Sequence, residues 1–205
     1  MWNRAEAQIN LILIRHGETH SNSLGRYLGR TDEELSEKGK ETLIANKTAG
    51  KYPKGEILFS SPMKRCLQTA ELIYNCKKPI LIEEWKEMDF GRFEGKNYEE
   101  LKEDIQYQAW IDSNGVLPFP EGESREEFER RCRKGLNKLL GVMEQKVGKA
   151  PPTAIIIVHG GSIMALLSAY CGGDYFDYRC KNGEGYVCAL TKNNREIRME
   201  IIRKL

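Results

Sequence analysis

The chain has 205 residues, of which 40% are hydrophobic and 30% are charged, and its 32 basic side chains nearly balance 30 acidic ones. A chain of this length buries roughly 70% of the surface that it exposes when unfolded, so one globular domain over residues 1–205 needs no metal or disulfide to support its core. The spread of apolar residues argues against intrinsic disorder, and a net charge of +2 argues against a nucleic-acid-binding protein.

Membrane insertion and export are not expected from this sequence. No stretch approaches the roughly 20 apolar residues of a membrane-spanning helix, and residues 1–10 lack the hydrophobic run of a signal peptide. The six cysteines form no C-x-x-C pair and are interpreted as scattered reduced thiols; they are Cys66, Cys76, Cys132, Cys171, Cys180 and Cys188. We therefore expect a cytoplasmic protein.

Hydrophobic runs and helical periodicity predict that strands and helices alternate along the chain. The clearest buried strands are the apolar runs INLILI and TAIIIV. Ser36 is a candidate cap for one helix, and Pro62 can open another. In chain order, the predicted elements are a strand over residues 9–14, a helix over 35–49, a strand over 56–59, a helix over 63–75, a strand over 79–82, helical segments over 97–110 and 124–147, a strand over 153–158, a helix over 162–170, and strands over 185–191 and 196–202 joined by a turn at 192–194.

This alternation predicts an α/β fold with a largely parallel sheet and an antiparallel edge. Residues 88–122 are expected to form a cap inserted into the single domain. The helix over residues 124–147 interleaves arginines with glutamates, which favours a solvated, salt-bridged helix over a partner or nucleic-acid face. Six aromatic side chains at or near the start of this cap are expected to pack in the core: Trp85, Phe90, Phe93, Tyr98, Tyr107 and Trp110.

Residues suited to anion binding and acid–base chemistry follow four of the predicted strands. Arg15 and His16 follow the first strand, and Arg65, Glu87 and His159 follow the next three. In open α/β sheets, ligands bind beyond the carboxyl ends of the strands. A neutral imidazole can attack phosphorus, and neighbouring arginines keep it unprotonated while they hold the phosphate. The pattern predicts an anion site with acid–base groups; a structural salt-bridge cluster at the sheet edge is the alternative.

Four blocks of sequence resemble the histidine phosphatase superfamily, which has the phosphoglycerate mutase-like fold. They are LIRHGET at residues 13–19 with Asn22, SSPMKRCLQTA at 60–70, EMDFGRFEG at 87–95 and VHGG at 158–161. The blocks occur in the family's order and the likeness spans residues 9–190. It implies a three-layer α/β/α sandwich, a mostly parallel sheet with an antiparallel edge, and a small helical cap.

The resemblance also implies a role for each matching residue. His16 would be the nucleophile that becomes phosphohistidine, and Glu87 the general acid that protonates the leaving alkoxide and then activates water, with Asp89 as the next choice. The predicted phosphate- and substrate-binding residues are Arg15, Asn22, Gly29, Arg65, His159 and Gly160, of which Arg15, Arg65 and His159 also count as catalytic. The implied mechanism needs no metal and no cofactor.

The expected activity is hydrolysis of a small phosphate monoester. Within the family, residues 25–32 and 87–91 look most like α-ribazole 5′-phosphate phosphatases, which act in cobalamin synthesis. A broad-specificity phosphatase, a phosphoglycerate mutase-type phosphotransferase and a phosphate-binding regulatory module without turnover are the alternatives. Arg26 and Arg30 either line the entrance or are surface arginines. We expect a small-molecule phosphate ester as the partner, no nucleic acid or membrane, and a monomer or homodimer.

Overall fold

The central sheet follows the predicted pattern closely. The computed structural model describes residues 7–75, 77–146, 150–193 and 196–205, and these form one six-stranded sheet in the order β3-β2-β4-β1-β5-β6. Strands β1 to β4 run parallel, whereas β5 and β6 pair antiparallel at one edge. The strands are β1 (Ala7–Arg15), β2 (Ile57–Ser60), β3 (Ile80–Leu81), β4 (Thr153–Val158), β5 (Gly185–Lys192) and β6 (Ile197–Lys204).

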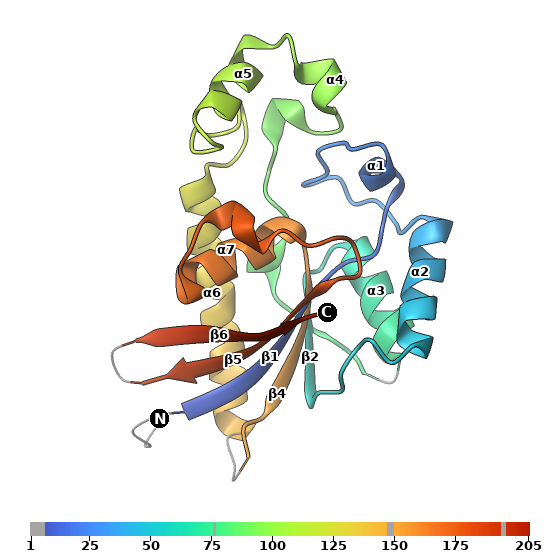
Figure 1. The fold of residues 1–205 in the computed structure, drawn as a ribbon, viewed down its shortest axis with the longest axis vertical. Coiled ribbons are helices and arrows are strands. Elements are labelled where there is room, and N and C mark those ends of the chain that lie inside the picture. Colours follow the sequence, from blue (N-terminus) through green and yellow to red (C-terminus); the bar gives the residue numbers. More distant parts are fainter. Residues whose placement is uncertain (1–6, 76, 147–149, 194–195) are drawn as a thin grey trace.

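Helices cover both faces of the sheet, which confirms the three-layer α/β/α architecture (Figure 1). Successive residues of a strand point to opposite faces, so β1 supplies Leu11 and Leu13 to one core and Ile12 and Ile14 to the other. The first core is completed by α6 (Arg125–Met143) and α7 (Gly160–Cys171), and the second by α2 (Glu37–Thr48) and α3 (Lys64–Tyr74).

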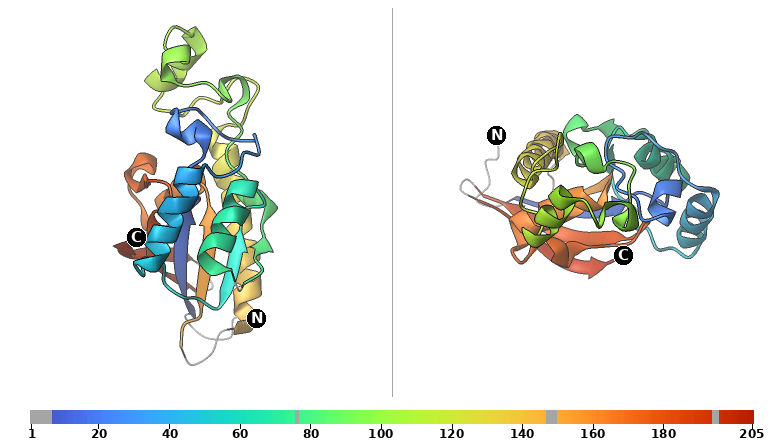
Figure 2. Two further views of the ribbon diagram at one scale, coloured as in Figure 1. Left: turned by 90° about the vertical axis from the view of Figure 1, so that its right-hand side faces the viewer. Right: turned by 90° about the horizontal axis from the view of Figure 1, so that it is seen from above.

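Short helices gather beyond the carboxyl ends of the parallel strands. Figures 1 and 2 show α1 and the cap segment, which we define as residues 88–122, standing above the sheet. The treatment of this segment as an insertion into one domain stays a prediction. The short elements are α1 (His20–Ser23), α4 (Tyr98–Leu101), α5 (Ile105–Asp112) and the 3-10 helices η1 (Glu83–Trp85), η2 (Gly91–Phe93), η3 (Glu144–Lys146) and η4 (Tyr175–Tyr178).

Capping side chains explain where the helices depart from the predicted ranges. The helix predicted over residues 97–110 is two helices, because Asp104 accepts hydrogen bonds from the N–H groups of Gln106 and Tyr107 and starts α5 anew. Ser36 caps α2 as predicted, by accepting from the N–H of Gly39. The ends of the predicted helix at Val147 and of the predicted turn at residue 194 lie outside the described residues.

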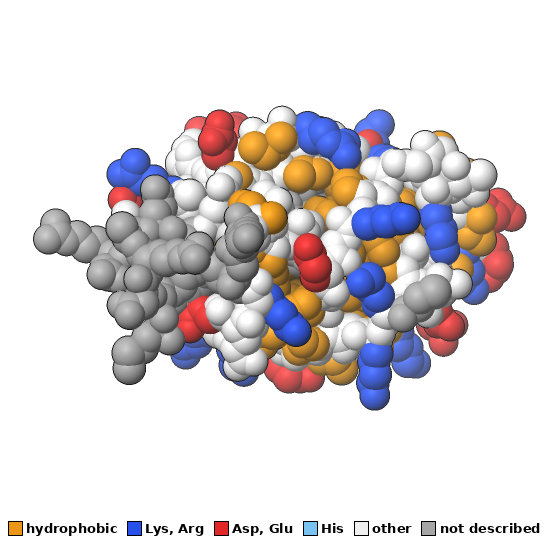
Figure 3. Space-filling model, turned by 90° about the horizontal axis from the view of Figure 1, so that it is seen from below, with side chains coloured by type: hydrophobic (Ala, Val, Ile, Leu, Met, Phe, Trp, Pro, Cys, Tyr) orange, Lys and Arg blue, Asp and Glu red, His pale blue; other side chains and the backbone are white. Residues whose placement is uncertain are grey.

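The opposite end of the molecule is a mixed surface. Figure 3 shows hydrophobic side chains there with charged side chains around and among them, and no histidine on the coloured part of this face. Among the described residues, no helix is long and apolar enough to cross a membrane. All five cysteines in the described part of the chain are free thiols, and Cys76 lies outside it. The cytoplasmic location stays a prediction.

Candidate active site

The fold brings the five predicted catalytic residues together at the carboxyl ends of the parallel strands. His16 follows β1 and His159 follows β4, and their ring centroids lie 5.2 Å apart in an edge-to-face arrangement. The His16, Arg65, Glu87 and His159 residues are each at most 7% exposed, and Arg15 is half-buried beside them. Because the site is shielded from water, charges within it interact more strongly than they would at the surface. Their catalytic roles stay predictions, but their proximity is a feature of the structure.

His16 is held as a neutral ring with one nitrogen fixed. Its Nδ1 lies 2.7 Å from the carbonyl oxygen of Gly17, so Nδ1 carries the proton and Nε2 keeps a lone pair. Burial lowers the pKa of His16 well below its usual value, and the positive charges of Arg65 and Arg15 lower it further. A neutral imidazole with a free Nε2 is the form that can act as a nucleophile.

The two arginines differ in how their donors are used. Arg65 is fully buried and donates to Nδ1 of His159 and to the carbonyl oxygens of Thr31 and Gly29. Arg15 donates from Nη1 to the carbonyl of Cys180 at 2.8 Å, but its buried Nε has no acceptor within the described residues. A buried cationic donor without a partner is costly. This free donor beside His16 fits an anionic ligand.

His159 presents a defined tautomer to the site. Because Arg65 can only donate, Nδ1 of His159 accepts, and Nε2–H donates to Oγ of Ser61 at 2.8 Å. Burial and the nearby cations lower the pKa of His159 well below its usual value. Cys66 touches the same ring, but burial raises the pKa of its thiol to about 12, so the thiol stays neutral.

Glu87 enters the site from the loop after η1. One oxygen accepts from the N–H of Met88 at 2.9 Å, and the other accepts from the N–H of Gly161 in the first turn of α7 at 3.3 Å. Burial raises the pKa of Glu87, although these N–H groups and the arginines oppose the rise. A Cβ on Gly161 would lie 2.5 Å from a Glu87 oxygen, so the carboxyl approaches this backbone as only glycine allows. Burial thus favours the protonated form of the Glu87 carboxyl beside the two arginines of the site.

Three further predicted binding residues take different positions. Asn22 accepts at Oδ1 from the amide of Asn182, so its NH₂ group is the end that can donate to a phosphate oxygen. Gly160 opens α7 next to the Arg15 guanidinium, where helix N–H groups favour an anion. Gly29 is different: its N–H donates to Glu94 and its carbonyl accepts from Arg65. Its backbone supports Arg65 instead of presenting a free donor.

Two supporting residues were not singled out from the sequence. Asn182 donates to the carbonyls of His16 and Gly17 and to Asn22, and so fixes the loop after β1. Glu94 accepts from the N–H groups of Gly29 and Thr31, whose carbonyls hold Arg65. Both act across long sequence separations, which local patterns do not reveal. The EG pair in the motif block at residues 87–95 was the one signal that marked Glu94.

Arg131 anchors the loop that carries Glu87. It forms a two-pronged ion pair with Glu123, at 2.7 and 2.8 Å, and donates to the backbone carbonyls of Glu84, Lys86 and Glu87. The Arg131 and Glu123 side chains are only 17% and 11% exposed. Helix α6 is salt-bridged as predicted, but this arginine faces inward. The loop position of Glu87 therefore depends on α6.

Arg131→Gln is expected to lower the free energy of unfolding by about 3 kcal/mol, because it leaves Glu123 and several carbonyls without their donor. Arg133→Gln on the same helix is the matched control, since Arg133 is 50% exposed and its ion pair with Glu129 is screened by water. This control should change stability by less than about 0.5 kcal/mol. Denaturant unfolding of both variants measures the difference, and equal effects would contradict the anchoring role.

Two cavities flank the buried site. The larger has a volume of about 1230 Å³ and its wall includes Arg15 and Asn22. The smaller has a volume of about 260 Å³ and its wall includes Glu87. Three residues line both cavities: Tyr27, Met164 and Arg179. Charged and polar residues predominate in the wall of the larger cavity and aromatic residues in the wall of the smaller one, and the two cavities adjoin at the shared residues.

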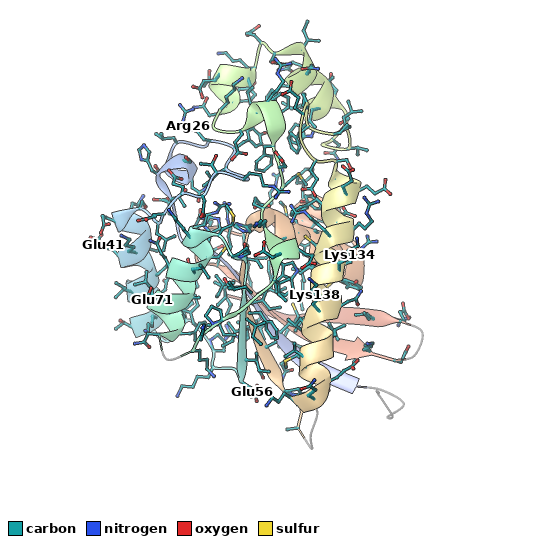
Figure 4. The ribbon with its side chains drawn as sticks, turned by 180° about the vertical axis from the view of Figure 1, so that it is seen from behind. Arg26, Glu41, Glu56, Glu71, Lys134 and Lys138 are labelled. Atoms are coloured by element: carbon teal, nitrogen blue, oxygen red, sulfur yellow. The ribbon has the colours of Figure 1, made fainter. Side chains whose placement is uncertain are left out.

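The two arginines considered for the entrance are both engaged in ion pairs. Arg26 lines the larger cavity and forms a two-pronged ion pair with Glu100 of α4, at 2.7 and 3.1 Å. Figure 4 shows Arg26 beside the cap segment, above α1. Arg30 lies 3.8 Å from Asp89 and is exposed. Arg26 thus ties the loop after α1 to the cap, whereas Arg30 is a surface residue.

Comparison with known proteins places this arrangement in a family. The model of the histidine phosphatase superfamily (branch 1) matches residues 11–200, so the chain belongs to that family, and it is a phosphatase. Phosphoserine phosphatase 1 from Hydrogenobacter thermophilus is 28% identical over 199 residues, which cover 92% of this chain and 90% of the relative.

Solved structures show the same fold. Phosphoglycerate mutase from Thermus thermophilus is 31% identical, with a TM-score of 0.68 and coverage of 96% of this chain and 98% of that chain. The α-ribazole phosphatase from Shigella flexneri is 24% identical, with a TM-score of 0.75 and coverage of 94% and 95%. At that identity, the second likeness is one of fold alone.

Proposed function

We propose that this phosphatase hydrolyses a small phosphate monoester in two steps through a phosphohistidine on His16, without a metal ion. The observation that carries the proposal is the neutral His16 beside the buried, unpartnered Nε of Arg15. The first group is a nucleophile and the second is a donor for a phosphoryl oxygen. Positioning and charge stabilisation supply most of the catalysis of phosphoryl transfer, so this pair meets its main requirements.

In the first step, Nε2 of His16 attacks phosphorus and forms the N–P bond while the bond to the leaving oxygen breaks. The positive charges of Arg15 and Arg65 stabilise the phosphoryl oxygens. Glu87 gives its proton to the leaving alkoxide, which departs as the alcohol. In the second step, the Glu87 carboxylate takes a proton from water, and the resulting hydroxide attacks phosphorus. The N–P bond breaks, which releases phosphate and restores both His16 and protonated Glu87.

Two substrates are candidates for this reaction. Residues 25–32 and 87–91 resemble those of α-ribazole 5′-phosphate phosphatases, which makes α-ribazole 5′-phosphate the first candidate. O-phosphoserine is the second, because a relative that matches most of this chain is named phosphoserine phosphatase. A mutase reaction on phosphoglycerate is the alternative suggested by the Thermus structure.

Phosphate release from a panel of monoesters in the presence of a chelator tests the proposal. The panel contains α-ribazole 5′-phosphate, O-phosphoserine, 3-phosphoglycerate, a sugar phosphate and an aryl phosphate. We expect turnover that the chelator does not reduce, with one of the first two esters giving the highest kcat/KM. Loss of turnover with the chelator would contradict the metal-independent mechanism, and isomerisation of 3-phosphoglycerate without phosphate release would favour the mutase reaction.

A further inference from the structure

The smaller cavity is walled by aromatic rings. It has a volume of about 260 Å³ and lies between the cap segment, α7 and η4. The aromatic residues of its wall are Tyr27, Phe90, Trp110, Phe119, Tyr175 and Phe176. Phe90 and Trp110 were expected to be core residues, but both are only half-buried and face this cavity. A mostly apolar pocket of this kind is the usual form of a small-molecule site.

The rings already pack in the geometries that aromatic groups prefer. Phe90 and Phe119 meet edge to face, with centroids 5.0 Å apart and planes at 89°, and Trp110 lies 4.9 Å from Phe119. Met88 and Met164 add flexible, polarisable surface to the wall. A planar ring entering the cavity would extend this arrangement. The indole N–H of Trp110 is also buried without an acceptor within the described residues.

The position of Glu87 assigns the cavity to the organic part of the substrate. In the proposed function, Glu87 protonates the leaving oxygen, so the alcohol lies on the side of the site where Glu87 faces open space. Glu87 and Gly161 line the smaller cavity, whereas the described residues that line the larger one do not include Glu87. The larger cavity instead carries Arg15 and Gly160, on the phosphate side. The leaving alcohol therefore enters the aromatic cavity.

The charges around the cavity leave an ammonium group of the leaving alcohol without a partner. Glu87 is the one carboxylate among the described residues of its wall, and in the reactive form it holds a proton. Arg125 lies 4.1 Å above the Tyr175 ring and pairs with Glu129, and Arg179 lies 4.4 Å above the Phe176 ring. The wall thus offers no free anion for the ammonium group of phosphoserine. An uncharged ring meets no such penalty.

From this geometry we infer that the aromatic cavity is the subsite for the leaving alcohol, and that the preferred substrates are phosphate monoesters of alcohols that carry a planar aromatic ring. The inference rests on the proposed function, because it uses Glu87 to locate the leaving oxygen. It also separates the two candidates: α-ribazole 5′-phosphate, with its aromatic base, fits this class, whereas O-phosphoserine does not.

Binding of non-hydrolysable phosphonates tests the inference without turnover. Calorimetry would compare 2-naphthylmethylphosphonate, cyclohexylmethylphosphonate and methylphosphonate on the wild-type protein. We expect the naphthyl compound to bind on the order of tenfold more tightly than the cyclohexyl compound, because ring packing adds to simple apolar burial. Equal dissociation constants for all three, or tightest binding of methylphosphonate, would overturn the inference.

Substitution of the wall residues locates the effect. Phe176→Leu keeps an apolar side chain but removes a ring, so the naphthyl compound should lose about tenfold in affinity while methylphosphonate is unchanged. Phe90→Leu is a second variant with the same expected pattern. Tyr98→Leu is the matched control, because Tyr98 lies in the cap segment at 55% exposure and is not part of the cavity wall. Losses that are equal for all three ligands, or equal in the control, would overturn the assignment.

Hydrolysis of matched alkyl esters separates this inference from the proposed function. Benzyl, 2-naphthylmethyl and cyclohexylmethyl phosphates all release primary alcohols, so differences in kcat/KM report on binding of the organic group. The inference predicts the order naphthylmethyl, benzyl, cyclohexylmethyl, with O-phosphoserine below all three. Hydrolysis of these esters in a different order would contradict the aromatic subsite but not the hydrolase function. If the naphthyl phosphonate binds most tightly but no ester is hydrolysed, the hydrolase function is contradicted and the aromatic subsite is not.

Discussion

Replacement of His16 with Asn is expected to lower phosphate release by on the order of 10⁴-fold or more, because an amide nitrogen has no lone pair that can attack phosphorus. Asn is close to the ring in size and can still donate to the carbonyl of Gly17, as Nδ1 of His16 does. The neighbouring arginines also remain. The loss should therefore fall on kcat, with ligand binding by phosphonates retained.

The covalent intermediate gives a direct readout of the same residue. Wild-type protein mixed with a ³²P-labelled ester and quenched in alkali should carry label on histidine, because an N–P bond survives alkali and is cleaved by acid. His16→Asn should carry none. His20→Asn is the matched control, since His20 is an exposed residue of α1 and, of the three histidines of the chain, the one outside the site. Label that persists in His16→Asn, or that disappears in His20→Asn, would mean that another residue is the nucleophile.

The sheet and the site residues at the ends of its strands could be predicted, because both depend on short stretches of sequence. The strands β1 and β4 are nearly uninterrupted apolar runs, and a run of this kind has few arrangements other than a buried strand. Arg15, His16 and His159 sit at the ends of those runs, so placing the strands also placed the side chains. In a parallel sheet the carboxyl ends lie on one edge, and the residues that follow them therefore meet.

The support around the site could not be predicted, because it consists of contacts between distant segments. Asn182 reaches His16 across 166 residues, and Glu94 reaches Gly29 across 65. Neither contact has a local pattern. Arg131 shows the same limit in another form: its helix has the charge alternation of a solvated helix, yet this side chain turns inward to the loop of Glu87. Charge alternation gives the periodicity of a helix but not the partner of each residue.

The aromatic residues near residues 85–110 show why composition could not distinguish core from cavity. Trp85, Phe93 and Tyr107 are buried, as expected, whereas Phe90 and Trp110 line the smaller cavity. The expectation was wrong for Tyr98, which is 55% exposed. All six are large aromatic groups in one short region, and their sequence periodicity does not separate core, cavity wall and surface. The difference depends on how the cap segment packs against α7 and η4. Only the folded arrangement shows it.

Replacement of Glu87 with Gln is expected to affect substrates according to their leaving groups. An alkyl phosphate releases a strongly basic alkoxide, so loss of the proton donor should lower its kcat/KM by about 10²- to 10⁴-fold. An aryl phosphate releases a stable phenolate, and its kcat/KM should fall less than about tenfold. Attack of water on the phosphohistidine still needs the carboxylate, so kcat should fall even for the aryl ester. A burst of one phenolate per active site would show that the second step has become limiting.

The pH dependence of wild type and Glu87→Gln tests the same role independently. Burial raises the pKa of Glu87, and the carboxyl donates only while it is protonated, so kcat/KM for an alkyl phosphate should fall as pH rises through that raised pKa. Gln does not titrate, so the kcat/KM of the variant should lack this fall at high pH, the basic limb of the pH profile. Asp89→Asn is the control, because Asp89 is partly exposed and pairs with Arg30. If Asp89→Asn removes the limb and Glu87→Gln keeps it, Asp89 is the proton donor. If each single variant keeps both the limb and full activity on alkyl phosphates, neither carboxylate is the acid.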